Sequence, residues 1–335
     1  MMWVWAPMLA CVLGLGLVMA RTRRRQGLLT RIDELLTAGH HQQVLDHDLQ
    51  PGPLLDPARL AQATSAVRSG RFRLALDLLA TSADDGTYLP PAGTAPTAST
   101  LRASALIGMG RYGEVARMLG HHPPQGPLSR LRAQAAVEAG EDTVAEDLLA
   151  AAAADPMEEA ARLRLLADLR LRRRDLTEGE RLARTARATF AGSSAQAAQL
   201  DAALCTLLIA RMRVETGAVA EALPLVNAGL EGLQSRPDEP VALAEAHALA
   251  ATVQAALGNG LEAGKHLALA QEQASRCQSP PLDAVLARAA ALVALQLGDR
   301  ETGRRLLHEA IADHEQLGAK PALAELRSVL AGLDA

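Results

Sequence analysis

SGRFRLALDLL at Ser69–Leu79 and MGRYGEVARML at Met109–Leu119 are two copies of one short pattern. Each copy has a glycine at its second position, a small or β-branched residue five positions later and a leucine nine positions later. Residues four apart lie on one face of a helix. Glycine tolerates the left-handed backbone that a tight turn requires. The pattern therefore predicts a tight turn followed by a helix with an apolar stripe.

This pattern recurs along most of the chain. Clear copies also begin at Ala139, Thr216, Leu257 and Leu297, and degenerate copies begin at Ala38 and Arg173. The turn positions are Gly39, Gly70, Gly110, Gly140, Arg174, Gly217, Gly258 and Gly298, with Arg174 in the place of a glycine. Neighbouring turn positions are 30 to 43 residues apart. That range is typical of repeats built from helical hairpins.

Small residues flank the turns at fixed distances. Seven residues before a turn stand Ala63, Ala103, Ala133, Ala167, Ala210, Ala251 and Ala291, and Ile32 takes this place in the first copy. Five residues after a turn stand Ala75, Ala145, Gly179, Ala222, Ala263 and Gly303, with Val44 and Val115 in the other two copies. Helix axes approach more closely where the contact residues are small. We expect these positions to pack the two helices of each hairpin, and neighbouring hairpins to cover one another.

The composition favours an all-α fold. Of 335 residues, 49% are hydrophobic but only two each are Trp, Tyr and Phe. Alanine and leucine are strong helix formers, whereas aromatic and β-branched residues favour strands.

Together, these features resemble the tetratricopeptide repeat family. The aromatic residue two positions after the turn glycine, Phe72 or Tyr112, is similar to the family's turn-packing aromatic. The chain departs from the family in lacking its early tryptophan, and its closing proline is clear only near Pro127 and Pro156. The resemblance implies a right-handed α-solenoid of about seven to eight hairpins over residues 26–335. Proline-rich and glycine-rich stretches predict loops near residues 82–99 and 121–127.

The N-terminal segment has the pattern of a membrane anchor. Residues 1–20 carry no charge and as a helix would span about 30 Å, the thickness of a bilayer core. Two tryptophans, Trp3 and Trp5, precede a basic cluster of Arg21, Arg23, Arg24 and Arg25. Because positive charge stays on the cytoplasmic side, residues 1–25 predict a single-pass protein with its N-terminus outside and its repeat domain in the cytoplasm. A cleaved signal peptide is disfavoured, since no positive charge precedes the apolar stretch.

The charge balance disfavours nucleic acid as a partner. The chain has a formal net charge of −4, and without the four N-terminal arginines its body has 30 basic against 38 acidic residues. Such a body repels phosphate backbones on average. One basic run, RLRLLADLRLRRRD at Arg162–Asp175, is interpreted either as a solvated helix face or as a patch for an acidic protein segment or anionic lipid.

Other candidate chemistry is weak. GNGLEAG at Gly258 has glycines like a phosphate-binding loop, but they occupy the repeat's own turn. The histidines near His40 and His121 form no complete ligand set, so we expect surface histidines rather than a metal site. No catalytic motif is found, and no cofactor is predicted.

We therefore expect an interaction scaffold without catalytic activity, which binds segments of an unidentified partner protein on the concave wall of the first helices. This expectation follows from the resemblance. The alternatives are an RNA-binding helical repeat and, less favoured, an enzyme with scattered catalytic residues.

Overall fold

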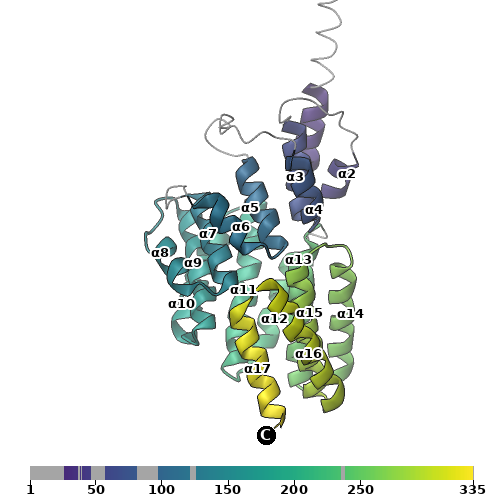
Figure 1. Ribbon diagram of the computed structural model, residues 1–335. Coiled ribbons are helices and arrows are strands. Elements are labelled where there is room, and N and C mark those ends of the chain that lie inside the picture. The colour runs from purple at the N-terminus through teal and green to yellow at the C-terminus, as the bar shows by residue number, and fades with distance from the viewer. Residues whose placement is uncertain are drawn as a thin grey trace, which may run out of the picture.

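The computed structural model describes residues 26–36, 38, 40–46, 57–80, 97–120, 126–234 and 238–334. All regular elements in these ranges are helices, which confirms the all-α prediction (Figure 1). The first helices of successive hairpins are α3 (Pro57–Arg68), α5 (Ala98–Gly108), α7 (Pro127–Ala139), α9 (Pro156–Arg172), α11 (Gln196–Glu215), α13 (Pro240–Ala256) and α15 (Pro280–Gln296). The second helices are α4 (Phe72–Ala80), α6 (Tyr112–Leu119), α8 (Asp142–Leu149), α10 (Leu176–Ala191), α12 (Val219–Gln234), α14 (Gly260–Ala274) and α16 (Arg300–Leu317). Before these hairpins, residues 26–36 form a helix that is followed by the short helix α2 (His41–Leu45). After the last hairpin comes α17 (Lys320–Asp334).

The hairpins stack as a two-layered solenoid. Each first helix packs against its own second helix and against the first helix of the next hairpin, as α9 packs against α10 and α11. Each second helix also packs against the first helix that follows it. The first helices thus form one continuous layer, and the second helices lie outside it (Figure 1).

The small residues around the turns lie inside this packing. All seven alanines that precede the turns, from Ala63 to Ala291, are 0% exposed. Ala75, Ala145, Ala222 and Ala263, which follow the turns, are also 0% exposed. At these points the helices are so close that a longer side chain would have no solvent-filled space to enter.

The turn positions have left-handed backbone. Gly217, between α11 and α12, has φ +78°, and the corresponding glycines of the other described hairpins have φ between +70° and +86°. Arg174 has φ +62° and is the one residue other than glycine with positive φ among the residues that the structure describes. Its guanidinium pairs with Glu215 of the next hairpin. For a residue other than glycine this backbone conformation costs about 1 kcal/mol of stability, and Arg174 adopts it despite that cost.

We expect glycine-to-alanine substitutions to have opposite signs at Gly217 and Gly264. A Cβ at either position would meet no atom within 4 Å, so packing does not decide the result. At Gly217 the left-handed backbone should make alanine destabilising by about 1 kcal/mol, whereas Gly264 lies inside α14, where alanine should stabilise by about 0.5–1 kcal/mol. Urea unfolding of both variants measures the difference, and equal signs would contradict the role of the turn.

The predicted anchor over residues 1–25, with its tryptophans and arginines, lies outside the described residues. None of the helices in the described ranges combines the length and the apolar character needed to cross a bilayer. The longest, α11, has 20 residues but carries Asp201, Arg211, Arg213 and Glu215. On this finding the predicted localisation, a single-pass membrane protein with a cytoplasmic repeat domain, is wrong.

The two predicted loops fall mostly outside the described residues as well. Residues 81–96 and 121–125 are not among them. Helix α5 begins at Ala98, inside the predicted loop 82–99, where the Thr97 hydroxyl caps it by accepting from the Thr100 amide. Helix α7 begins at Pro127, the last residue of the second predicted loop.

Candidate partner-binding interior

The two ends of the solenoid touch each other. The turns after α3 and α5 contact the loops before α13 and α15, more than 160 residues away along the chain (Figure 1). The backbone N–H of Gln278 donates to the Gly70 carbonyl at 2.9 Å, and the Ser279 hydroxyl donates to the Gly108 carbonyl at 2.9 Å. We call this contact the seam, formed by His41, Arg68, Gly70, Gly108 and Gly110 on one side and by Asp238, Glu239, Val241, Cys277, Gln278, Ser279 and Leu317 on the other.

An ion pair and a backbone contact extend the seam toward the N-terminus. Arg68 Nη1 lies 2.8 Å from Glu239 Oε1, and the His41 amide donates to Asp238 Oδ2 at 3.2 Å. The His41 side chain is buried, and its pKa is lowered by burial and by the nearby Arg68. The expectation of surface histidines therefore fails at His41, while His40 is exposed.

Two turn glycines also allow the close approach across the seam. A Cβ at Gly70 would lie 2.8 Å from Cys277 Sγ, and a Cβ at Gly110 would lie 2.4 Å from Leu317 Cδ2. The sequence predicts these glycines as turn residues. Their second role, in contact with the far end of the chain, has no signal in the repeat pattern.

Inside the closed solenoid lies a network of charged side chains from consecutive first helices. Arg172 of α9 pairs with Glu138 of α7 at 3.1 Å and with Asp168 at 3.5 Å. Burial raises the pKa of Glu138, while Arg172 opposes the rise. The pKa of Tyr112, at the start of α6, is raised by burial and by the charge of Glu138. Residues of three successive hairpins therefore share one electrostatic environment.

Two further charges, Arg211 of α11 and Glu245 of α13, belong to the same interior. The pKa of Glu245 is raised to about 7, first by burial and then by Glu138 and Asp168, with Arg211 opposing. Both residues are nevertheless exposed to solvent. In the described part of the chain neither makes a hydrogen bond or an ion pair. Arg211 and Glu245 are thus a cation and an anion that a bound molecule could engage.

Replacement of Glu245 by glutamine should change how stability depends on pH. Because the folded-state pKa is raised above the ordinary value of 4.5, the folded state binds more protons between pH 4.5 and 7, and stability falls as the pH rises through this window. The side chain keeps contact with water, so we expect Glu245→Gln to stabilise by less than about 1 kcal/mol at pH 8 and to have little effect at pH 4.5. Urea unfolding at both pH values tests this, with Glu231→Gln on the outer helix α12 as the control. An equal effect of the two variants would contradict the interior placement of Glu245.

A polar position on the first helices was missed in the sequence. Six residues before the turns stand Thr64, Ser104, Gln134, Asp168, Arg211 and Thr252 in the six middle copies, with Asp33 in the first copy and the apolar Leu292 in the last. Asp168 and Arg211 belong to the interior network, and the shared register places the other four of the middle copies on the same face of their helices. The distance from the turn is thus a sequence signal for this stripe, as it is for the alanines.

The basic run from Arg162 to Asp175 is engaged within the chain. Its ion-pair partners come from three hairpins: Arg162 pairs with Glu159, Arg164 with Asp201, Arg170 and Arg173 with Glu146, Arg172 with Glu138, and Arg174 with Glu215. The run therefore links hairpins to one another, a role that neither of the two interpretations from sequence included.

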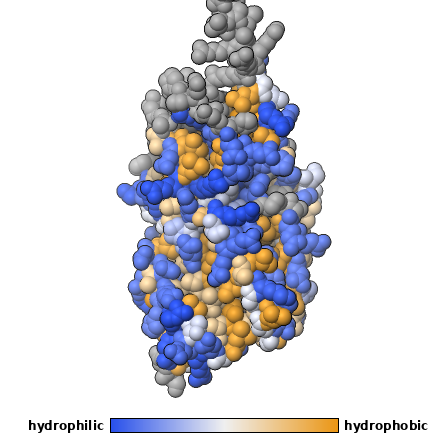
Figure 2. Space-filling view, turned by 90° about the vertical axis from the view of Figure 1, so that its right-hand side faces the viewer, coloured by the Kyte–Doolittle hydropathy of each residue, from blue (hydrophilic) through white to orange (hydrophobic). Residues whose placement is uncertain are grey.

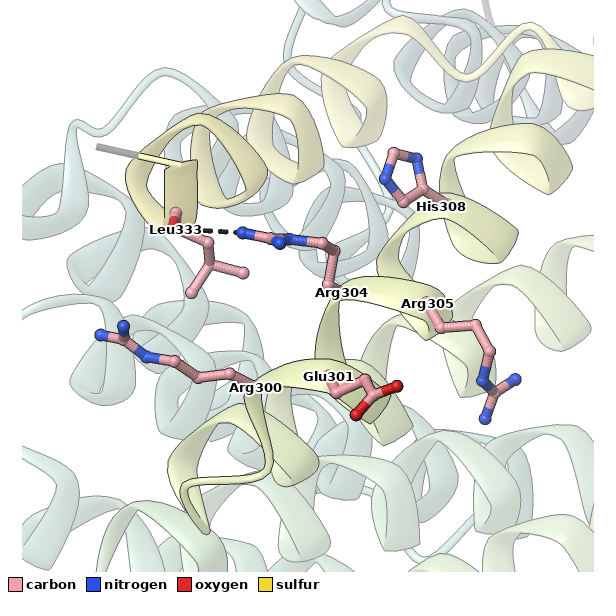
Figure 3. Close-up of a pocket in the computed structure, with 6 residues that line it drawn as sticks. All are labelled: Arg300, Glu301, Arg304, Arg305, His308 and Leu333. Atoms are coloured by element: carbon pink, nitrogen blue, oxygen red, sulfur yellow. Dashed lines mark hydrogen bonds between the residues drawn. The ribbon is translucent and has the colours of Figure 1, made fainter.

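Other surface features give weaker candidates. A hollow of about 440 Å³ between the start of α16 and the end of α17 is lined by Arg300, Glu301, Arg304, Arg305, His308 and Leu333 (Figure 3). There the Arg304 guanidinium donates to the Leu333 carbonyl at 3.4 Å, while the Arg305 side chain points away from it. The face seen in Figure 2 mixes hydrophobic and hydrophilic residues without one continuous apolar band.

Motifs for phosphate or metal receive no support from the described geometry. Gly258 has φ +80° in the turn before α14, the role that its place in the repeat predicts. Within the described ranges no three His, Cys, Asp or Glu side chains are grouped so that they could hold a metal ion.

Comparison with known proteins identifies the architecture. No protein-family model matches the chain, and no curated protein matches it. The chain is similar to a solved structure of the APC/C hetero-tetramer Cut9-Hcn1, with TM-score 0.55 and 14% identity over 83% of this chain and 51% of that one. It is also similar to a Rap protein complexed with Competence and Sporulation Factor, with TM-score 0.50 and 13% identity over 82% of this chain and 96% of that one. The chain thus spans about half the length of the Cut9-Hcn1 chain, and at these identities the likeness shows the fold alone.

Proposed function

Because this chain has a tetratricopeptide-like fold, we propose that it is a protein-interaction scaffold that binds an extended segment of a partner protein in the interior of its solenoid. The observation that carries the proposal is the pair Arg211 and Glu245. Both charges face the interior and remain without an ion pair in the described part of the chain.

An extended polypeptide fits this interior chemically. Its backbone offers donors and acceptors along its whole length, which the polar stripe from Thr64 to Thr252 can engage. Its side chains can supply an acid for Arg211 and a base for Glu245. Charged groups that are partly desolvated in this way contribute mainly to specificity, because an unmatched partner leaves a charge unpaired.

The similar structures support a role in assembly. Cut9 is found in a hetero-tetramer with Hcn1, and the Rap protein is found in complex with Competence and Sporulation Factor. We propose the same class of role, protein binding, for this chain.

The proposal assigns no catalysis to the interior. Two of its three acids, Glu138 and Asp168, are paired with Arg172, and the third is the proposed partner-binding residue Glu245. The buried thiol of Cys205 has its pKa raised to about 12 by burial, so it is protonated at neutral pH and a poor nucleophile.

Site-specific photo-crosslinking tests the proposal. A photoreactive residue replaces Gln134 or Thr252 in the polar stripe, and the matched controls replace the exposed residues Ala220 or Leu261 on second helices. We expect polypeptide adducts from the interior positions in living cells, and their loss when Arg211→Glu and Glu245→Lys are added. Adducts from the outer positions alone, or interior adducts to RNA instead of protein, would refute the proposal.

A further inference from the structure

The seam is a smaller contact than the packing between neighbouring hairpins. Neighbouring hairpins share buried apolar clusters, such as that formed by Leu207, Ala210, Val226 and Val253 across α11, α12 and α13. Across the seam, Val241 of α13 packs against the buried cluster of Ala66, Phe72, Ala75 and Ala105. Around this single apolar contact lie the partly exposed ion pair of Arg68 and Glu239, hydrogen bonds to loops and the close contacts of Gly70 and Gly110. Because the seam buries fewer apolar side chains than a hairpin interface and its ion pair is partly exposed, it is the weaker contact and can open first.

We propose that the seam is a gate that opens to admit the partner segment into the interior and then closes around it. This inference rests on the proposed function for the identity of the occupant, an extended polypeptide. The opening itself is a property of this chain alone.

The solenoid can open without unfolding. Each hairpin contacts mainly its neighbours, so a small rotation at every hairpin interface adds up to a large displacement between the two ends. The first contacts to break would be Arg68 with Glu239 and Ser279 with Gly108, and both leave hydrogen-bonding groups at the surface, where water can satisfy them. The hairpin cores remain buried in both states, which makes two discrete arrangements possible.

The seam also offers a position for a covalent lock. A Cβ at Gly70 would lie 3.1 Å from the Cβ of Cys277 and 2.8 Å from its sulfur, which a shift of a few tenths of an ångström brings to disulfide geometry. In the variant Gly70→Cys, oxidised glutathione should therefore join residues 70 and 277. The control carries Gly70→Ser and Cys277→Ser, which impose the same left-handed backbone strain but cannot be joined.

The substitution Glu245→Cys places a thiol in the interior, and the rate at which it is labelled measures access. The Gly70→Cys protein and its control both carry this substitution together with Cys11→Ser. The probe is a polyethylene glycol maleimide, whose extended polymer is a stand-in for a polypeptide segment, and iodoacetamide reports access for small molecules. We expect the locked protein to react with the polymer at least about tenfold more slowly than the control, because the lock removes an open state that is a minor population in the control. Iodoacetamide should react equally with both. Equal rates of polymer labelling in the two proteins would overturn the gate. Failure of a folded, helical Gly70→Cys protein to form the disulfide would also overturn it.

A charge exchange gives a second measurement in case the glycine variants do not fold. Arg68→Glu places two carboxylates together at the seam and should speed polymer labelling of residue 245, whereas Arg68→Glu combined with Glu239→Arg should restore the slow rate. Identical rates in the single and double variants would also count against the gate. Because the labelling uses no partner protein, its failure is distinct from failure of the crosslinking experiment that tests the scaffold.

Discussion

Replacing Ala222 by leucine is expected to lower the free energy of unfolding by about 3 kcal/mol. Ala222 lies five residues after the turn at Gly217 and is 0% exposed. It belongs to the cluster that also contains Ala210, the alanine seven residues before the same turn. Three added carbon atoms at this point must push α11 and α12 apart, because a close-packed interior has no space for them.

Ala220→Leu is the matched control for this substitution. Ala220 lies on the same helix, two residues away, and is exposed. The same change there should alter stability by no more than about 0.5 kcal/mol. Urea unfolding followed by circular dichroism measures both variants, and a similar loss in the two would show that general effects on α12, not close packing at residue 222, cause the destabilisation.

The repeat pattern predicted the local structure because each hairpin is specified by residues close together in the sequence. A turn glycine and small residues at fixed distances from it define two helices and their contact, and neighbouring hairpins then stack. Arg174 shows the strength of this register, since it takes the left-handed turn conformation without being glycine.

The seam could not be predicted in the same way. It joins Gly70 to Cys277 and Gly110 to Leu317, and whether they meet depends on small rotations summed over several hairpin interfaces. No local pattern encodes that sum. The ion pairs of the basic run have the same character, because their acids come from other hairpins. The polar stripe has a local signal, the sixth residue before most turns, but the apolar pattern that predicts the helices does not include this position. The predicted localisation rested on the uncharged N-terminal segment and on the tryptophans and arginines at its ends, all of which lie outside the described residues.

Leu307→Ala should destabilise the last hairpin by about 3 kcal/mol, and the effect should extend across the seam. Leu307 of α16 is 0% exposed and packs in a cluster with Ala291, Ala310 and Leu326. Loss of a buried leucine costs about 2–5 kcal/mol through lost burial and the remaining cavity. In an open solenoid the damage would stay near the end of the array, because each hairpin depends on its neighbours. Here α16 ends at Leu317, which contacts Gly110 in the turn between α5 and α6.

Hydrogen exchange distinguishes the two cases. The Arg111 amide, which donates to the Leu106 carbonyl at 2.8 Å beside that turn, should exchange faster in Leu307→Ala although it is nearly 200 residues away. Leu261→Ala is the control, since Leu261 is 76% exposed on α14 and its truncation should leave both regions unchanged. Faster exchange confined to α15, α16 and α17 would mean that the seam transmits no stability and that the two ends of the solenoid are energetically independent.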